Sequence, residues 1–304
     1  MNEIEIHSVV DFNSINYYRY MVQNYRLTCS DPTRLKFYMH VVNNEKLAGV
    51  LSQEVIDNEK EELGLSGVFS VPAQHGPNAS SFHVLGLHSA LDNMDHKKLC
   101  ILADTDTVMV YKDWDLKIEK MMLKDSYGII ASTYEDIGQP CSGTGKLQTP
   151  KNVPSCTWVA ISPNYDFSQL RLDVYLGQPW LISTEEMSRT FNLPLGYELQ
   201  RESGWQIAPY CNDRNIPFFT FINGSPLLGV TPTGHTIKVL CPPAHPQDLP
   251  LGVKQYNEEY QFDDGTPFFC HQRGSLRHRF RENPHSTYFY DACEYYLKQN
   301  FSIG

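Results

Sequence analysis

The first hundred residues alternate between two hydrophobic periods, and this alternation constrains the fold more than any other feature of the chain. Short apolar runs typical of strands are each followed by a stretch with helical spacing. Strands are predicted at 3–10, 35–42, 67–71 and 99–103, and helices at 15–27, at 52–63 and from Ser80 onward. Strands that alternate with helices over this length indicate an α/β unit with a mostly parallel sheet.

The second half of the chain has a different pattern. Strands are predicted at 127–133 and 157–161, and a loop rich in Gly, Pro and Ser separates them. Helical periodicity is clear here at about 184–191 and 288–299. We place a soft boundary near residue 115, which we expect to divide two halves of one domain.

Composition and charge place the chain among ordinary globular proteins. Its 304 residues are 41% hydrophobic and 20% charged, and 25 Lys and Arg against 35 Asp and Glu give a net charge of −10. A chain of this length buries a large core without needing a disulfide or metal to fold. The negative balance disfavours non-specific binding to nucleic acid or anionic membranes, although it leaves room for a local basic site.

The sequence carries no evident targeting signal. Its first residues are acidic and lack the basic and apolar regions of a signal peptide. No apolar run approaches the ~18 residues of a membrane span. The eight cysteines are scattered without a CxxC pair, which is typical of reduced thiols. We therefore expect a cytoplasmic protein without a transmembrane segment.

Two aspartates, Asp104 and Asp106, follow the predicted strand at 99–103 and are separated by one residue. In an extended chain this spacing puts both carboxylates on the same side. The pair would lie at the carboxyl end of the strand, where open α/β sheets place their ligands. Asp-x-Asp also occurs by chance in solvated turns, but the preceding strand and helix favour a site for Mg²⁺ or Mn²⁺.

Residues 80–93 (SSFHVLGLHSALDN) and 98–106 (KLCILADTD) together resemble glycosyltransferases of the GT-A fold, especially the family 2-like branch. The resemblance implies one GT-A domain over residues 1–304. Its mostly parallel central sheet would be flanked by helices, with a smaller mixed sheet on the acceptor side. Residues 1–115 would form the nucleotide-sugar (donor) half. Residues 116–304 would form the acceptor half, including a C-terminal segment that binds metal and phosphate.

The same resemblance assigns roles to residues of the donor half. Asp106 would bind Mn²⁺ or Mg²⁺, and Asp104 would contact the metal or the ribose. Val10, Asp11 and His83 would line the donor pocket. The default donor implied by the Asp-x-Asp motif is a UDP-sugar.

A second segment, residues 268–281 (FFCHQRGSLRHRFR), concentrates positive charge in an acidic chain. Guanidinium groups bind phosphate through paired hydrogen bonds, so Arg273 and Ser275 are candidate contacts for a diphosphate. For Arg279 and Arg281 we expect a solvated basic edge. GT-A enzymes often bring a C-terminal histidine to the metal, and the resemblance implies that His271 is this third ligand.

A third segment, residues 198–207 (ELQRESGWQI), supplies a candidate general base. Inverting members of the family carry an acid in the acceptor half, often before a tryptophan, and Glu202 resembles it. The sequence reads Glu-Ser-Gly-Trp where the family commonly has an aspartate or an acid pair. Asp213, Glu198 and Asp166 therefore stay open as alternatives.

These features predict a metal-dependent, inverting glycosyltransferase that moves a sugar from a nucleotide-sugar to an acceptor hydroxyl. The acceptor could be a glycan, a lipid-linked sugar or a hydroxymethylated DNA base of a phage. One alternative is a nucleotidyltransferase of related sheet topology, although the Gly-rich loop it would need after the first strand is absent. The other is a carbohydrate-binding protein without catalytic activity.

Overall fold

The computed structural model describes residues 3–43, 49–71, 79–133, 154–172, 181–182, 199–200, 204, 206–223, 227–230, 236–239 and 257–272, and the structural statements below refer to these. Of the expected features, the helices at 184–191 and 288–299 lie outside the described residues.

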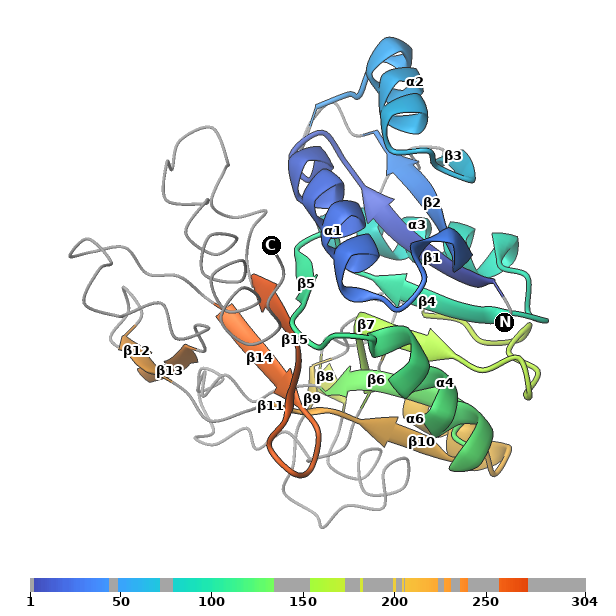
Figure 1. Ribbon diagram of the computed structural model, residues 1–304, viewed down its shortest axis with the longest axis vertical. Helices are drawn as coiled ribbons and strands as arrows, with labels where there is room; N and C mark the ends of the chain where they lie inside the picture. The colour runs from blue at the N-terminus through green and yellow to red at the C-terminus, as the bar shows by residue number, and fades with distance from the viewer. Residues whose placement is uncertain are drawn as a thin grey trace.

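A seven-stranded sheet forms the centre of the molecule, in the order β10-β6-β7-β4-β1-β2-β3 (Figure 1). β1 pairs in parallel with β2 and β4, as do β2 with β3 and β10 with β6. β7 is antiparallel to both of its neighbours, β4 and β6. The strands are β1 (Ile4–Val10), β2 (Leu35–Val42), β3 (Gly67–Val71), β4 (Leu99–Ala103), β6 (Ile129–Thr133), β7 (Pro154–Ile161) and β10 (Phe218–Thr220). The α/β class predicted from the sequence is confirmed.

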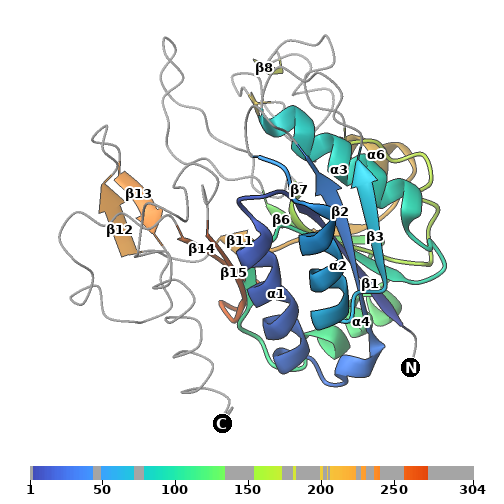
Figure 2. The same cartoon turned by 90° about the horizontal axis from the view of Figure 1, so that it is seen from above.

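Helices cover both faces of this sheet (Figure 2). α1 (Ile15–Thr28), α2 (Gln53–Glu62) and α4 (Trp114–Lys124) pack on one face. α3 (Ala79–Asn93) and α6 (Ile207–Asp213) pack on the other. The alternation of side chains along each strand separates the two cores: Ile4 and Ile6 of β1 join the first, whereas Cys100 and Leu102 of β4 join the second. A short 3₁₀ helix, η1 (Pro32–Arg34), leads into β2.

A smaller sheet of four strands lies beside the central one, in the order β11-β14-β15-β5, with antiparallel pairing throughout. Its strands are β5 (Thr107–Met109), β11 (Ile222–Asn223), β14 (Asn257–Gln261) and β15 (Pro267–Gln272). Two further two-stranded sheets are β8 (Leu181–Ile182) with β9 (Leu199–Gln200), and β12 (Leu227–Val230) with β13 (Thr236–Val239). Because β5 begins directly after Asp106, pairing of β15 with β5 brings the C-terminal part of the chain to the Asp-x-Asp turn.

Helix α3 is held by three contacts that fall within four residues, two to the sheet and one to the segment that follows β7. A Cβ atom at Gly86 would lie 2.4 Å from Cγ1 of Val9, so this glycine lets the helix approach β1 closely. The Ser89 hydroxyl lies 2.9 Å from Nδ1 of His40 on β2. The backbone N–H of Leu172 donates to Nε2 of His88 over 3.1 Å. These contacts determine where the side chains of the preceding turn can reach.

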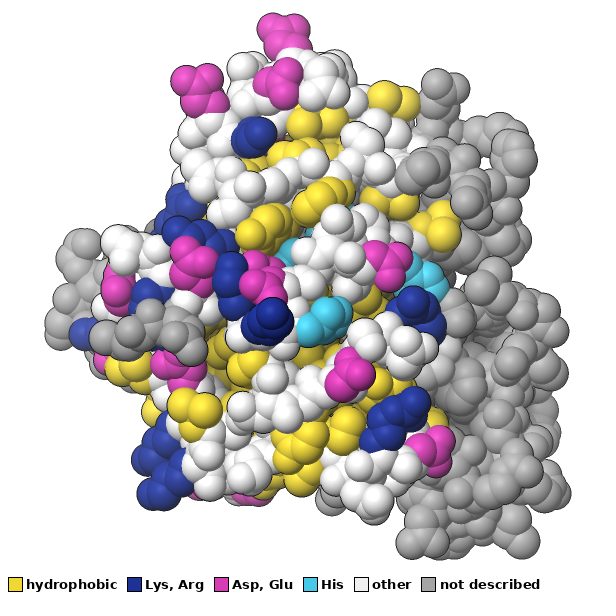
Figure 3. All heavy atoms as spheres, turned by 90° about the vertical axis from the view of Figure 1, so that its right-hand side faces the viewer, with side chains coloured by type: hydrophobic (Ala, Val, Ile, Leu, Met, Phe, Trp, Pro, Cys, Tyr) yellow, Lys and Arg dark blue, Asp and Glu magenta, His cyan; other side chains and the backbone are white. Residues whose placement is uncertain are grey.

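Basic and acidic side chains are interspersed over the face shown in Figure 3. An ion-pair group joins the start of β1 to β4, where Lys98 Nζ lies 3.0 Å from Oε2 of Glu3 and 3.0 Å from Oε1 of the buried Glu5. Within the part of the chain that the structure describes, no helix combines the length and apolar character needed to cross a membrane.

Candidate functional site

The Asp-x-Asp turn connects β4 to β5 and is fixed by hydrogen bonds to its backbone. The N–H of Asp104 donates to the carbonyl of Thr157 on β7 over 2.9 Å. Thr107 donates twice to the carbonyl of Asp104, from its N–H over 3.2 Å and from its hydroxyl over 2.7 Å. Since the Thr107 proton is used there, the Tyr25 hydroxyl is the donor in their 2.8 Å contact. The turn therefore presents both aspartates in a fixed conformation.

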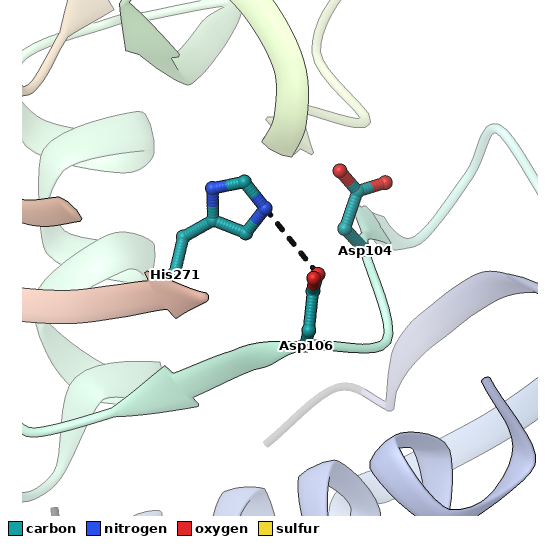
Figure 4. Close-up of side chains that lie close together, drawn as sticks. All are labelled: Asp104, Asp106 and His271. Carbon is teal, nitrogen blue, oxygen red and sulfur yellow. Dashed lines mark ion pairs between the residues drawn. The ribbon is translucent and has the colours of Figure 1, made fainter. Parts of the chain in front are cut away.

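Strand β15 adds a histidine to the two aspartates. Its register places His271 opposite Thr107 on β5, one residue past Asp106. Nε2 of His271 lies 3.3 Å from Oδ1 of Asp106, and both residues are more than 90% buried. Figure 4 shows Asp104 and Asp106 rising from the turn on the side where the His271 ring lies. One ligand atom from each of the three residues can be chosen so that all lie within 4.8 Å of one another.

His83 contacts the same site from α3. Its Nε2 lies 3.1 Å from Oδ1 of Asp104, and the side chains are 29% and 23% exposed. Burial by itself would lower the pKa of His83. Attraction to Asp104, their hydrogen bond, and the charges of Asp106 and Asp11 outweigh burial and raise that pKa above its ordinary value. His83 is therefore in direct contact with one carboxylate, that of Asp104, and is also affected by the charges of Asp106 and Asp11.

Asp11 also has a structural role at the end of β1. Its Oδ1 accepts hydrogen bonds from the N–H groups of Asn13 (3.0 Å) and Ser14 (2.8 Å). The N–H of Asp11 donates in return to the Ser14 hydroxyl over 2.8 Å. This reciprocal arrangement leads the chain into α1. Val10, the other donor-side candidate on this strand, is fully buried in the core beneath α1.

The donor set of the cluster fits a hard divalent cation. Carboxylate oxygens are the ligands that Mg²⁺ and Mn²⁺ prefer, and an imidazole nitrogen is compatible with a transition metal such as Mn²⁺. Asp104, Asp106 and His271 are the one such group found among the described residues. Two carboxylates, Asp104 and Asp106, each contact one of two imidazoles, His83 and His271. A bound dication would offset this negative charge.

The other predicted site residues either lie outside the described residues or are exposed. Glu202, Arg273 and Ser275 lie outside the described residues, as does the alternative base Glu198. Asp213 ends α6 and is exposed. Asp166 is exposed as well, and its Oδ1 accepts from the N–H of Ser168 over 2.9 Å; hydrogen bonds from Ser168 hold the pKa of Asp166 below its ordinary value.

Asn24 supports β5, the strand that follows the Asp-x-Asp turn, and was not singled out from the sequence. It is buried on α1, where its amide donates to the carbonyl of Met109 over 3.1 Å and accepts from the N–H of Met109 over 2.7 Å. This pair of bonds fixes β5 on α1. A signal was present, because Asn24 is a polar residue on the mostly apolar stripe that contains Met21 and Tyr25.

No protein-family model matches this sequence, and neither does any curated protein. Among solved structures, residues 1–349 of TarS from S. aureus align at 12% identity and a TM-score of 0.37, covering 58% of this chain and 52% of that one. GlyE from Streptococcus pneumoniae TIGR4, a glycosyltransferase, aligns at 11% identity and a TM-score of 0.34, covering 54% of this chain and 35% of that one.

The mannosyltransferase PcManGT from Pyrobaculum calidifontis, in complex with GDP-Man and Mn²⁺, aligns at 10% identity and a TM-score of 0.35. The alignment covers 53% of this chain and 44% of the mannosyltransferase chain. The chain thus spans about half the length of these structures or less. At such scores the likeness transfers no activity to this chain, and the proposal below depends on the chain's own residues.

Proposed function

We propose that this chain is a metal-dependent glycosyltransferase that moves a sugar from a nucleotide-sugar, by default a UDP-sugar, to an acceptor hydroxyl. One observation supports it above all: Asp104, Asp106 and His271 come together at the carboxyl end of β4. In open α/β sheets the ligand binds at this edge. A cation site there suits a ligand that carries a diphosphate. The sequence resemblance to GT-A enzymes supplies the remaining parts of the proposal.

The buried environment explains why these residues suit such a role. Asp106 and His271 are each less than 10% exposed, so water screens the charge of the Asp106 carboxylate little and a cation beside it is attracted strongly, while neutral His271 would offer a ring nitrogen as a ligand. When bound, Mn²⁺ or Mg²⁺ would neutralise the negative charge that develops on a departing diphosphate. Asp104 is more exposed than Asp106, and we propose that its carboxylate faces both the cation and the donor.

The other assignments complete the reaction. Val10, Asp11 and His83 would form the donor side, and Arg273 and Ser275, which follow β15 in the sequence, would contact the diphosphate. Glu202 would accept the proton of the acceptor hydroxyl as that oxygen attacks the anomeric carbon, which inverts its configuration. The acceptor we propose is a hydroxyl of a glycan or lipid-linked sugar, or of a hydroxymethylated DNA base. We place the donor half in residues 1–115 and the acceptor half in residues 116–304 of one domain.

A thermal-shift panel of nucleotide-sugars, each with and without Mn²⁺, tests the proposal. A ligand that binds the native state at about 100 times its Kd adds about 2.7 kcal/mol to the free energy of unfolding. We expect one nucleotide-sugar to raise the melting temperature only when Mn²⁺ is present. Asp106→Asn should abolish that shift, whereas Asp125→Asn, which changes an exposed residue at the end of α4, should retain it. A shift that Asp106→Asn leaves intact would contradict the proposal.

A further inference from the structure

Each aspartate of the Asp-x-Asp turn has its own histidine partner. His271 of β15 contacts Asp106, and His83 of α3 contacts Asp104 over 3.1 Å. The two histidines are not equivalent, however. The group whose ligand atoms all lie within 4.8 Å of one another includes His271 and leaves out His83. His83 therefore meets Asp104 from outside the cluster of candidate ligands.

The position of His83 is set by the packing of α3. The helix is fixed on the sheet three to six residues further along, by the close approach of Gly86 to Val9 and by the contact of Ser89 with His40. A rotation or slide that moved His83 away from Asp104 would force Gly86 off Val9 or break the Ser89 contact. His83 is thus held against Asp104 by a helix that has little freedom to move.

A carboxylate that binds a metal is usually oriented by a hydrogen-bond donor on one of its oxygens, and losing such a donor typically weakens metal binding about 10–100-fold. We infer that His83 is a positioning residue, which holds Asp104 through Oδ1 and thereby orients this carboxylate for the divalent cation. This inference rests on the proposed metal site. It differs from the donor-pocket role that the resemblance implies, because here His83 acts through Asp104.

Mn²⁺ titration of the full chain by calorimetry, without any nucleotide-sugar, tests the inference. His83→Ala should weaken Mn²⁺ binding about 10–100-fold. His83→Gln, whose amide can still donate to Asp104, should restore most of the affinity. Asp92→Asn, on the same helix with a side chain that is 61% exposed, should bind as the wild type does. The thermal midpoint of each metal-free variant reports whether the fold is kept.

The outcomes separate the two claims. If Asp106→Asn loses Mn²⁺ binding while His83→Ala binds within about twofold of the wild type, the metal site stands and the positioning inference is wrong. If His83→Ala loses binding as completely as Asp106→Asn and glutamine restores none of it, His83 is itself a ligand and the inference is again wrong. If the wild type binds no Mn²⁺, the proposed function fails and the inference fails with it.

Discussion

A buried pair of histidines between β1, β2 and α3 should make the protein lose stability steeply in acid. Nδ1 of His7 lies 3.0 Å from Nε2 of His40, and both side chains are fully buried. Nε2 of His7 lies 3.4 Å from the Glu5 carboxylate, which can only accept. His7 therefore donates to Glu5 and accepts from His40, which in turn accepts from Ser89. When both rings are neutral, each N–H or O–H donor in this series of hydrogen bonds has an acceptor.

The pKa shifts give the sign and size of the effect. Burial, with repulsion from His7, lowers the pKa of His40 to about 3, and burial also lowers the pKa of His7 against the attraction of Glu5. In the unfolded chain both would titrate near 6.5. Below that pH the unfolded state binds protons that the folded state does not, so stability falls as pH falls. Between pH 7 and pH 5, His40 alone removes about 2 kcal/mol.

Glu5 acts in the same direction at lower pH. Burial would raise its pKa, but hydrogen bonds from His7, the N–H of Asp95 and Lys98 outweigh burial and lower that pKa to about 2. Because the folded-state pKa is depressed, this contribution is present above about pH 4.5 and is lost as the pH falls toward 2. A measurement above pH 5 therefore reports on the histidines.

Urea unfolding at pH 7 and pH 5, on the wild type and on His40→Gln, checks this reasoning. Glutamine can donate to His7 and accept from Ser89, but it does not titrate. Because the raised pKa of His83 acts in the opposite direction in both proteins, the difference between them is the test: from pH 7 to pH 5 the wild type should lose about 2 kcal/mol more unfolding free energy than His40→Gln. Equal losses in the two proteins, within about 0.5 kcal/mol, would refute the account of the buried pair.

Two further substitutions test how the site is supported. Gly86→Ala would place a methyl group 2.4 Å from Val9, so we expect about 1–3 kcal/mol of destabilisation by urea unfolding, and an unchanged midpoint would show that α3 does not pack as described. Asn24→Leu would leave the buried N–H and carbonyl of Met109 without their partner, which should cost about 1–3 kcal/mol in the same assay. It should also weaken Mn²⁺ binding, because β5 loses two hydrogen bonds to α1 and keeps the one between Tyr25 and Thr107; full Mn²⁺ affinity in a destabilised variant would show that the turn does not depend on Asn24.

Most of the first hundred residues could be predicted from local periodicity. The strands at 35–42, 67–71 and 99–103 have the expected bounds, because each is a short, largely apolar run that ends at a polar residue or a proline. Helix α4 was missed although Trp114, Ile118 and Met121 follow helical spacing. The start signal was present in the sequence, since Asp113 stands directly before Trp114, although in the structure Asp113 has a left-handed φ of 57° and its side chain makes no capping hydrogen bond.

Contacts between segments that lie far apart in the sequence could not be predicted from the local pattern of apolar and polar residues. The antiparallel position of β7 between β4 and β6 depends on pairing across the sheet, which a single strand's sequence does not encode. The sequence pointed to Asp104, Asp106 and His271 through a motif and a resemblance, and the structure brings them together; their role as ligands stays a prediction. The contact of His83 with Asp104 depends on how α3 docks on the sheet, so only the folded structure shows it.

We propose that the cluster at the end of β4 serves transfer of a sugar from a nucleotide-sugar. The most direct test of this proposal is analysis of the nucleotide product after incubation with nucleotide-sugars and Mn²⁺. We predict release of a nucleoside diphosphate by the wild type, its loss when EDTA removes the metal, and its loss in Asp106→Asn. Release of pyrophosphate would instead identify a nucleotidyltransferase, and nucleoside diphosphate release that persists in Asp106→Asn would contradict the account.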